Sequence, residues 1–274
     1  KIISQLFTKN KYKKFKFLIR VRMKNQTSIK EWLKRIFSCF SIFFIGGLVI
    51  CHASNATNND ISNLVYDIDS KPFNIQYSDW TEKWWQWGYS IPQNNHPAYD
   101  DTGKFCQENQ KKPVWFFPGT YQHSVTRYCE IPHGVGVLFP ILNSECSFAE
   151  YPEMKTKEEL SICAKQIQDT IIPEFATLND VEIPNLEKYR IQSDIFNLTI
   201  PENNILDLQP QITQAVSDGL WVFLKPLEVG NYELKFKGDV KNIKYNETND
   251  DTDKDEFAGP IGWNYTTTYI LTVK

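Results

Sequence analysis

The sequence predicts a mainly β fold, a Greek-key-like β-sandwich with two inserted α-helices. Several short segments between residue 113 and the end of the chain have strand character and are separated by turn residues. Two other segments have the apolar spacing of helices. Near the C-terminus, Leu227, Gly230 and Tyr232 have the spacing of a tyrosine corner, in which a tyrosine at a strand start bonds back across the corner of a Greek-key sandwich. Together these observations indicate a sandwich with helical decoration.

The first helix is predicted in the segment YSDWTEKWWQWGYSIP, residues 77–92. Asp79 and Glu82 resemble a capping box, and Pro92 follows the predicted end. Four aromatic residues fall on one face, which we expect to pack against the sandwich: Tyr77, Trp80, Trp84 and Trp87. Trp85 lies off this face, so it is the tryptophan that we expect to be available to a ligand.

Three strands are predicted after a long loop. The loop, residues 91–112, is rich in Pro, Asn, Asp and Gly, and long loops in compact domains often carry function. The segment 113–120 is a short apolar strand, and the segment 123–132 alternates in polarity, which is typical of a half-exposed strand. The segment 134–143 is apolar on both faces and should lie in the middle of a sheet.

The second helix is predicted to begin after Thr156, which forms a capping box with Glu159. The apolar positions that follow have helical spacing and place Cys163 on the core side. Asn179 and Asp180 then form a hairpin turn signal. The remaining segments are a loop over 201–219 and strands over 189–201, 219–227, 230–238 and 264–274.

Residues 1–56 are predicted to be a leader. A translation start at Met23 would leave residues 1–22 untranslated and would begin a signal peptide with basic residues followed by an apolar run. Small residues allow cleavage after residue 53 or 56, so the signal peptide spans 23–53 or 23–56. The alternative is an uncleaved N-terminal membrane anchor.

The rest of the chain is predicted to hold one domain. Residues 57–76 are a polar lead-in, and residues 77–274 are assigned to a single β-sandwich domain with helical insertions. About 218 residues follow the leader, which is enough for one well-filled core. The signal peptide predicts that the protein is secreted or lies at the cell surface.

The part of the chain after the leader is strongly acidic. The whole chain has 30 Lys+Arg and 33 Asp+Glu, but residues 1–56 contain 12 of the basic residues and one of the acidic ones. The remainder therefore has a net charge of −14. Such a surface repels nucleic acid and anionic membranes. We expect no nucleic-acid partner, and no membrane contact beyond an uncleaved anchor.

Four cysteines follow the leader: Cys106, Cys129, Cys146 and Cys163. An even number of cysteines in an exported chain indicates two disulfides, and three pairings are open. Pairing sequence neighbours, 106 with 129 and 146 with 163, is the simplest choice. A zinc site formed by all four cysteines is the alternative, although the chain has no C-x2-C pair.

The chain has no familiar catalytic signature, since it lacks G-x-S-x-G, H-E-x-x-H, the P-loop and G-x-G-x-x-G. His123 and His133, together with Asp100 and Asp101, could converge on zinc or a similar metal. Ordinary turn or surface histidines are the alternative. Arg127 lies in a predicted strand and could bind a carboxylate or a sugar hydroxyl, with a structural ion pair as the alternative.

An acidic run near the C-terminus offers alternating carboxylates at Asp251, Asp253 and Asp255. Such a pattern can bind calcium, but Glu256 and Gly262 stand where an EF-hand needs glycine and glutamate. A solvated acidic loop is the alternative to an irregular calcium site. The sequence therefore requires no cofactor, and calcium or zinc are the metals that its residues could take.

Several phrases resemble an uncharacterised family of secreted bacterial and archaeal proteins. They are WWQWGYSIP, the D-x-TG stretch at Asp100–Gly103, PVWFFPGT, RYCEIPHG, YRIQSDIFNLTIP and SDGLWVFLKPLEVGNYELKFKG. The resemblance covers roughly residues 80–274. It implies one exported domain with cysteines at 106, 129 and 146, and it implies no activity, because none is established for the family. His96 does not belong to the family pattern, which argues against a role as a ligand.

Two functions are compatible with these features. The first is an exported, disulfide-stabilised binding or structural domain of the cell surface, with a glycan or a cell-surface protein as partner. Its candidate contacts are Trp85, Asp101, His123 and Arg127. The alternative is an extracellular hydrolase that uses carboxylates or a metal bound by His and Asp, for which the carboxyl separation would be decisive.

Overall fold

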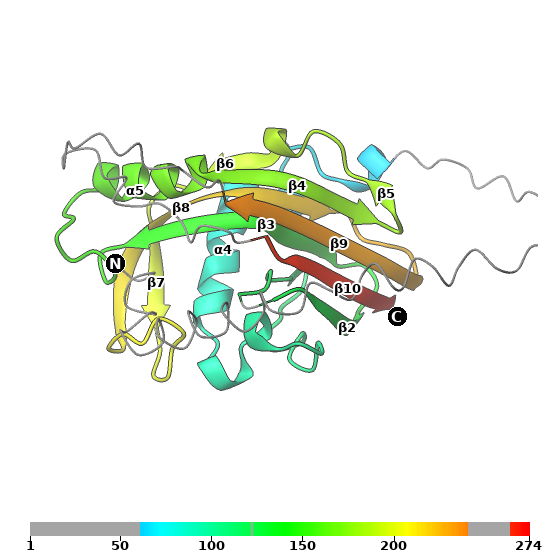
Figure 1. Ribbon diagram of the computed structural model, residues 1–274, viewed down its shortest axis with the longest axis horizontal. Helices are drawn as coiled ribbons and strands as arrows, with labels where there is room; N and C mark the ends of the chain where they lie inside the picture. Colours follow the sequence, from blue (N-terminus) through cyan, green and yellow to red (C-terminus); the bar gives the residue numbers. More distant parts are fainter. Residues whose placement is uncertain (1–60, 122, 241–263) are drawn as a thin grey trace, which may run out of the picture. The chain divides into compact units, whose positions relative to one another are not determined.

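The computed structural model describes residues 61–121, 123–240 and 264–274 (Figure 1). Within these residues the protein is a β-sandwich of two five-stranded sheets with two α-helices, as the sequence predicts. The predicted leader and the acidic run with Asp251, Asp253 and Asp255 lie outside the described residues. None of the described helices is long and apolar enough to span a membrane.

The first sheet, called sheet A, is organised around strand β8. β8 (Gln211–Leu224) pairs antiparallel with β3 (Gly136–Ser147) on one side, and with β6 (Arg190–Gln192) and β7 (Phe196–Ile200) on the other. β1 (Val114–Phe116) continues the sheet beyond β3 and runs parallel to it. β3 thus has strands on both sides, as expected for a segment that is apolar on both faces.

The second sheet, called sheet B, has the strand order β2-β10-β9-β4-β5. Its strands are β2 (Val125–Ile131), β4 (Ile171–Leu178), β5 (Val181–Glu182), β9 (Gly230–Val240) and β10 (Thr266–Val273). β10 lies between β2 and β9, parallel to the first and antiparallel to the second. Parallel pairs therefore occur in both sheets, which the sequence patterns did not indicate.

The main core lies between the two sheets, because each strand turns alternate side chains inward. β2 shows this regularly: every second residue from Val125 to Ile131 is buried and the residues between them are exposed, which confirms the half-exposed strand. Phe139 of β3 and Val222 of β8 meet Phe236 of β9 and Leu271 of β10 in this core. The alternating sequence pattern thus translates directly into the inner and outer faces of sheet B.

Helix α4 (Tyr77–Tyr89) covers the outer face of sheet A. The four residues of the predicted aromatic face are all buried: Tyr77, Trp80, Trp84 and Trp87. They belong to one cluster with Phe116, Leu138, Trp221 and Phe223 of the sheet, which confirms the predicted packing. The predicted capping box is wrong, since the helix begins at Tyr77 with Gln76 as an N-cap whose side chain makes no bond. The Tyr77 hydroxyl instead anchors the first turn by donating to the Trp221 carbonyl (3.0 Å).

Helix α5 (Lys157–Asp169) packs against β3 and β8 of sheet A. Thr156 and Glu159 form the predicted capping box, in which each side chain accepts a bond from the other residue's backbone N–H. Cys163 faces the sheet and forms a disulfide with Cys146 of β3. The second disulfide joins Cys106 to Cys129, so the simplest pairing is confirmed and the zinc alternative for the cysteines is wrong.

Two turn predictions are confirmed and one loop prediction is wrong. Asn179 and Asp180 connect β4 to β5 with positive φ angles of 52° and 61°, as a tight hairpin requires. The Tyr232 hydroxyl donates to the Glu228 carbonyl (3.0 Å), which is the predicted tyrosine corner. The loop predicted at 201–219 is shorter than expected, because β8 begins at Gln211.

The connections between these elements contain short 3-10 helices. They occupy Ile61–Leu64, Pro72–Asn74, Gln93–Asn95, Pro97–Tyr99 and Leu186–Tyr189.

Candidate functional site

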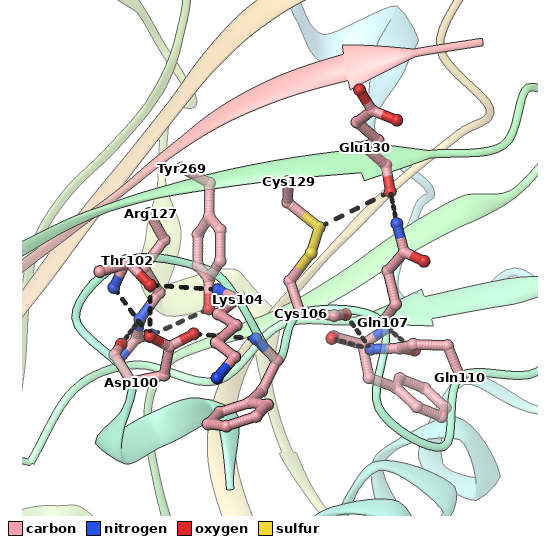
Figure 2. The surroundings of a disulfide bond; sticks show 12 residues. Asp100, Thr102, Lys104, Cys106, Gln107, Gln110, Arg127, Cys129, Glu130 and Tyr269 are labelled. Atoms are coloured by element: carbon pink, nitrogen blue, oxygen red, sulfur yellow. Dashed lines mark hydrogen bonds between the residues drawn. A yellow bond between two sulfur atoms is a disulfide. The ribbon is translucent and has the colours of Figure 1, made fainter. Parts of the chain in front are cut away.

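Arg127 lies at the centre of a buried hydrogen-bond cluster that fastens two loops to sheet B (Figure 2). Its Nε donates to the Asp100 carbonyl (2.6 Å) and its Nη2 to the Ala98 carbonyl (3.1 Å). Its Nη1 lies within hydrogen-bond distance of the carbonyls of Pro118 (3.2 Å) and Gly119 (3.0 Å) and of the Tyr269 hydroxyl (2.9 Å). We call this set the Arg127 hub. Arg127 is 1% exposed and its guanidinium is committed to carbonyl oxygens, so here it holds the loops together and is not presented at the surface.

Asp100 organises the same loop from within. Its Oδ1 accepts bonds from the backbone N–H and the hydroxyl of Thr102, and its Oδ2 accepts one from the Phe105 N–H (2.9 Å). Desolvation acts to raise the pKa of Asp100, but the bonds from Phe105 and Thr102 and the charge of Arg127 outweigh it and lower that pKa. The carboxylate is therefore a structural acceptor in a turn.

The Cys106–Cys129 disulfide adds a covalent link between the same loop and β2 (Figure 2). The disulfide, the Arg127 hub and the bond from the Tyr128 N–H to the Thr102 carbonyl (2.9 Å) attach the loop to sheet B at three points. The Asp100 turn stabilises the loop from within. The backbone that carries Asp101 is consequently held against β2.

Asp101 and His123 form the exposed part of this region. The His123 Nε2 lies 3.1 Å from the Asp101 Oδ2, and the two side chains are 54% and 58% exposed for His123 and Asp101 respectively. Nearby in sequence, the rings of Tyr99 and Tyr121 are 5.2 Å apart, and Tyr121 is 37% exposed. The structure thus brings together two of the predicted ligand contacts, from segments 22 residues apart.

Trp85 and His133 lie elsewhere. The Trp85 ring is buried against Trp84 and Tyr89, with ring centroids 5.1 and 5.3 Å away. Although Trp85 lies off the predicted aromatic face, it is 6% exposed and is not presented at the surface of α4. His133 follows β2 at its far end, where its Nε2 lies 3.9 Å from a Glu228 carboxylate oxygen. Within the described residues, no three His, Cys, Asp or Glu side chains converge as a metal site.

His96 is buried under the helix end in a neutral form. Its Nδ1 accepts from the Ala98 N–H (3.1 Å), which leaves the proton on Nε2 for the Gly88 carbonyl (3.1 Å). Burial lowers the pKa of His96 to about 4; the bond to Gly88 opposes this shift and the charge of Arg127 adds to it. His96 therefore stays uncharged at neutral pH and closes the helix end.

We expect His96 to make the fold acid-sensitive. Its folded pKa lies below the unfolded value of 6.5, so the stability that it contributes is complete above pH 6.5 and falls as the pH drops toward 4. The loss should reach about 3 kcal/mol. Urea unfolding at pH 7 and pH 4.5 should show a smaller pH dependence for His96→Gln than for the wild type. The exposed His133→Gln is the control, and an equal pH dependence in all three proteins would contradict this account.

A pair of buried carboxyl groups was not anticipated from the sequence. Glu145 of β3 and Glu150 in the turn after it are each 8% exposed and lie within hydrogen-bond reach of each other. The Tyr89 hydroxyl donates to Glu145 Oε2 (2.9 Å), and the Ser147 hydroxyl donates to Glu150 Oε2 (2.7 Å). Burial raises the pKa of Glu150 well above its usual range, and the charge of Glu145 raises it further. The sequence carried no clear signal for the pair, because Glu145 lies among Asn143, Ser144 and Ser147 at the polar end of β3.

Unsatisfied polar atoms gather on the same face of sheet A, toward α4. Five of the eight such atoms in the described part of the chain belong to this region: Trp85 Nε1, Asn143 Nδ2, Glu145 Oε1, Ser217 Oγ and Trp221 Nε1. The register of β3 and β8 explains why these atoms lie together. Asn143 is paired with Gly219 and Glu145 with Ser217, and paired residues project their side chains from the same face of the sheet. A Cβ atom at Gly219 would lie 2.5 Å from Trp221 Nε1 and 2.7 Å from the Asn143 Cβ, so only glycine permits this approach. Buried groups of this kind normally have partners, so the region is a candidate for a bound group.

An open depression of about 420 Å³ lies at the start of α4, and its volume is within the range of ligand sites. Asp69, Gln76, Ser78 and Gln192 contribute polar side chains to its lining, but none of the residues predicted as ligand contacts does. Arg190 also borders it, but its guanidinium is taken by Asp169 (2.7 Å) and Asp218 (2.8 Å). The depression is therefore a second candidate binding surface, after the one that carries Asp101 and His123.

Comparisons with known proteins add little to this geometry. No protein-family model matches the chain, and no curated protein matches it. Among solved structures, a chain of "Structure of PbICP-C in complex with falcipain-2" is similar over 59% of this chain and 98% of its own length. The sequence identity is 9% and the TM-score is 0.22, so this likeness carries no argument.

Proposed function

We propose that this protein is an exported binding domain of the cell surface that recognises a glycan through Asp101 and His123. The observation that carries the proposal is the exposed Asp101–His123 pair, in which Asp101 lies on a loop attached to sheet B at three points and His123 lies just before β2. The two disulfides fit a domain that folds in an oxidising compartment. The proposal includes export of the protein, binding of a glycan, and membership of the family of secreted bacterial and archaeal proteins that the sequence resembles.

The chemistry of the exposed pair suits sugar hydroxyls. A carboxylate accepts hydrogen bonds from neighbouring hydroxyls, and an imidazole can donate one and accept another. The exposed Tyr121 ring, beside Tyr99, offers an aromatic surface for the apolar face of a sugar. Because the loop is already fixed, binding would order little additional chain, which favours affinity.

The hydrolase alternative has weaker support. Asp100 is used inside its own turn, and Asp101 lies on the surface beside His123. Glu145 and Glu150 are in contact with each other, whereas glycosidase carboxyls are separated by roughly 5–9.5 Å. Binding without catalysis therefore fits the described geometry better.

A glycan array with the purified wild-type protein tests this function. We expect the double variant Asp101→Ala/His123→Ala to lose at least about tenfold in affinity for the glycans that the wild type binds. His133→Ala is the matched control, because it removes a similarly exposed histidine at the other end of β2. An absence of glycan binding by the wild type would contradict the proposal. Loss in Gln192→Ala but not in the double variant would move the site to the depression beside α4.

A further inference from the structure

The carboxyl pair under α4 lacks a positive partner within the described residues. No lysine, arginine or histidine of the described residues forms an ion pair with Glu145 or Glu150. The hydroxyls of Tyr89 and Ser147 donate to the pair, and the two carboxyl groups lie within hydrogen-bond reach of each other. Two carboxyl groups in contact away from water repel each other unless a positive charge lies between them. That charge can be a proton or a metal cation.

Additional oxygen atoms at the pair distinguish these two possibilities. Glu145 Oε1 is buried without a hydrogen-bond partner, and so is Ser217 Oγ. Ser217 is 0% exposed and lies directly opposite Glu145 in the β3–β8 ladder, so both side chains project from the same face. A shared proton would leave the Ser217 hydroxyl unexplained, whereas a cation would take both oxygens as ligands.

We propose that Glu145 and Glu150 bind a calcium ion between helix α4 and sheet A. Carboxylate and hydroxyl oxygens are the donors that a hard cation prefers, and calcium accepts irregular oxygen sets more readily than magnesium. Zinc and copper are less suited, since no imidazole or free thiol lies in this group and Cys146 is in a disulfide. Through Tyr89, the ion would also strengthen the attachment of α4 to the sheet. The ligands proposed here, Glu145 and Glu150, differ from Asp101 and His123 of the glycan proposal.

Calcium-dependent thermal unfolding of the oxidised full chain tests the proposal. After treatment with EDTA, adding calcium to about 100 times its Kd should raise the Tm of the wild type by about 5 °C or more. Glu145→Gln and Glu150→Gln should each abolish the rise, because each removes one carboxylate at nearly constant volume. Glu153→Gln, an exposed glutamate in the same turn, is the matched control and should retain it.

A second measurement covers the case in which a variant does not fold. Terbium replaces calcium in oxygen sites and emits light when nearby tyrosine or tryptophan is excited, and Tyr89 is bonded to Glu145. The wild type should show this emission, and calcium should quench it by displacement. An absence of both the Tm rise and the emission in the wild type would overturn the proposal. So would a calcium effect that survives in both glutamine variants but disappears in Asp251→Asn/Asp253→Asn/Asp255→Asn.

Discussion

Replacing Arg127 by lysine is expected to lower the free energy of unfolding by about 3–5 kcal/mol, although the charge is conserved. A lysine has three donors on one nitrogen and cannot reach carbonyls on both sides of the hub at once. The carbonyls of Ala98 and Asp100 would then lose their charged donor inside the protein. Denaturant unfolding followed by tryptophan fluorescence measures the change, which should appear as a lower midpoint with an unchanged slope.

Arg190→Lys provides the control for the substitution itself. Arg190 is partly exposed and its main partners are the carboxylates of Asp169 and Asp218, which a lysine can still approach as a point charge. The change keeps the charge but loses one of the two bonds to Asp218, so the free energy of unfolding should fall by about 1–2 kcal/mol, less than for Arg127→Lys. Equal losses in the two variants would mean that the carbonyl hub contributes no more than an ordinary ion pair.

Replacing Trp84 by alanine is expected to cost about 4 kcal/mol, which is the range for removing a large buried aromatic side chain. The Trp84 ring touches those of Trp85, Trp87 and Trp221, and its Nε1 donates to the Phe117 carbonyl (3.1 Å). The substitution removes both the packing and the bond that joins α4 to the segment after β1. A fall in Tm of about 10 °C, measured by circular dichroism, is the expected result.

Gln86→Ala is the appropriate control on the same helix. Gln86 is exposed, and its amide donates only to the Asn197 carbonyl (3.0 Å). Because the substitution also improves helix propensity slightly, its net effect should lie within about 0.5 kcal/mol. If Gln86→Ala destabilised the protein as much as Trp84→Ala, the stability of α4 would not depend on its aromatic face.

Local patterns predicted the elements whose stability is decided locally. The capping box at Thr156 and the turn at Asn179 depend on neighbours within a few residues, and both are found in the structure. The start of β8 was missed because Gln211, Ile212 and Gln214 are exposed, and because the polar residues Ser217 and Asp218 further along are buried by tertiary contacts. Asp218, for example, is held by Arg190 from the adjacent strand β6. No spacing rule in a single sequence contains that information.

Only the part of the candidate site formed by residues close in sequence was predicted, namely Asp101 and His123, which are 22 residues apart. The long loop and β2 do meet, so the expectation that Asp101 and His123 belong to one region was useful. The role of Arg127 was not accessible, because its acceptors are backbone carbonyls, which every residue carries. The Glu145–Glu150 pair escaped because charged residues near a strand end usually face solvent, and only the position of α4 buries them here.

The position of β10 makes the two halves of the chain dependent on each other. β10 supplies Tyr269 to the Arg127 hub from 142 residues away, and it is the only link between β2 and the rest of sheet B in the described ladder. Until β10 docks, β2 has no sheet to join, although its disulfide with the preceding loop can already form. Contacts of such long sequence separation form late and slow the folding of a domain. A fragment that lacks β10 should therefore not present the surface with Asp101 and His123, and a nascent chain acquires this surface only after β10 has emerged.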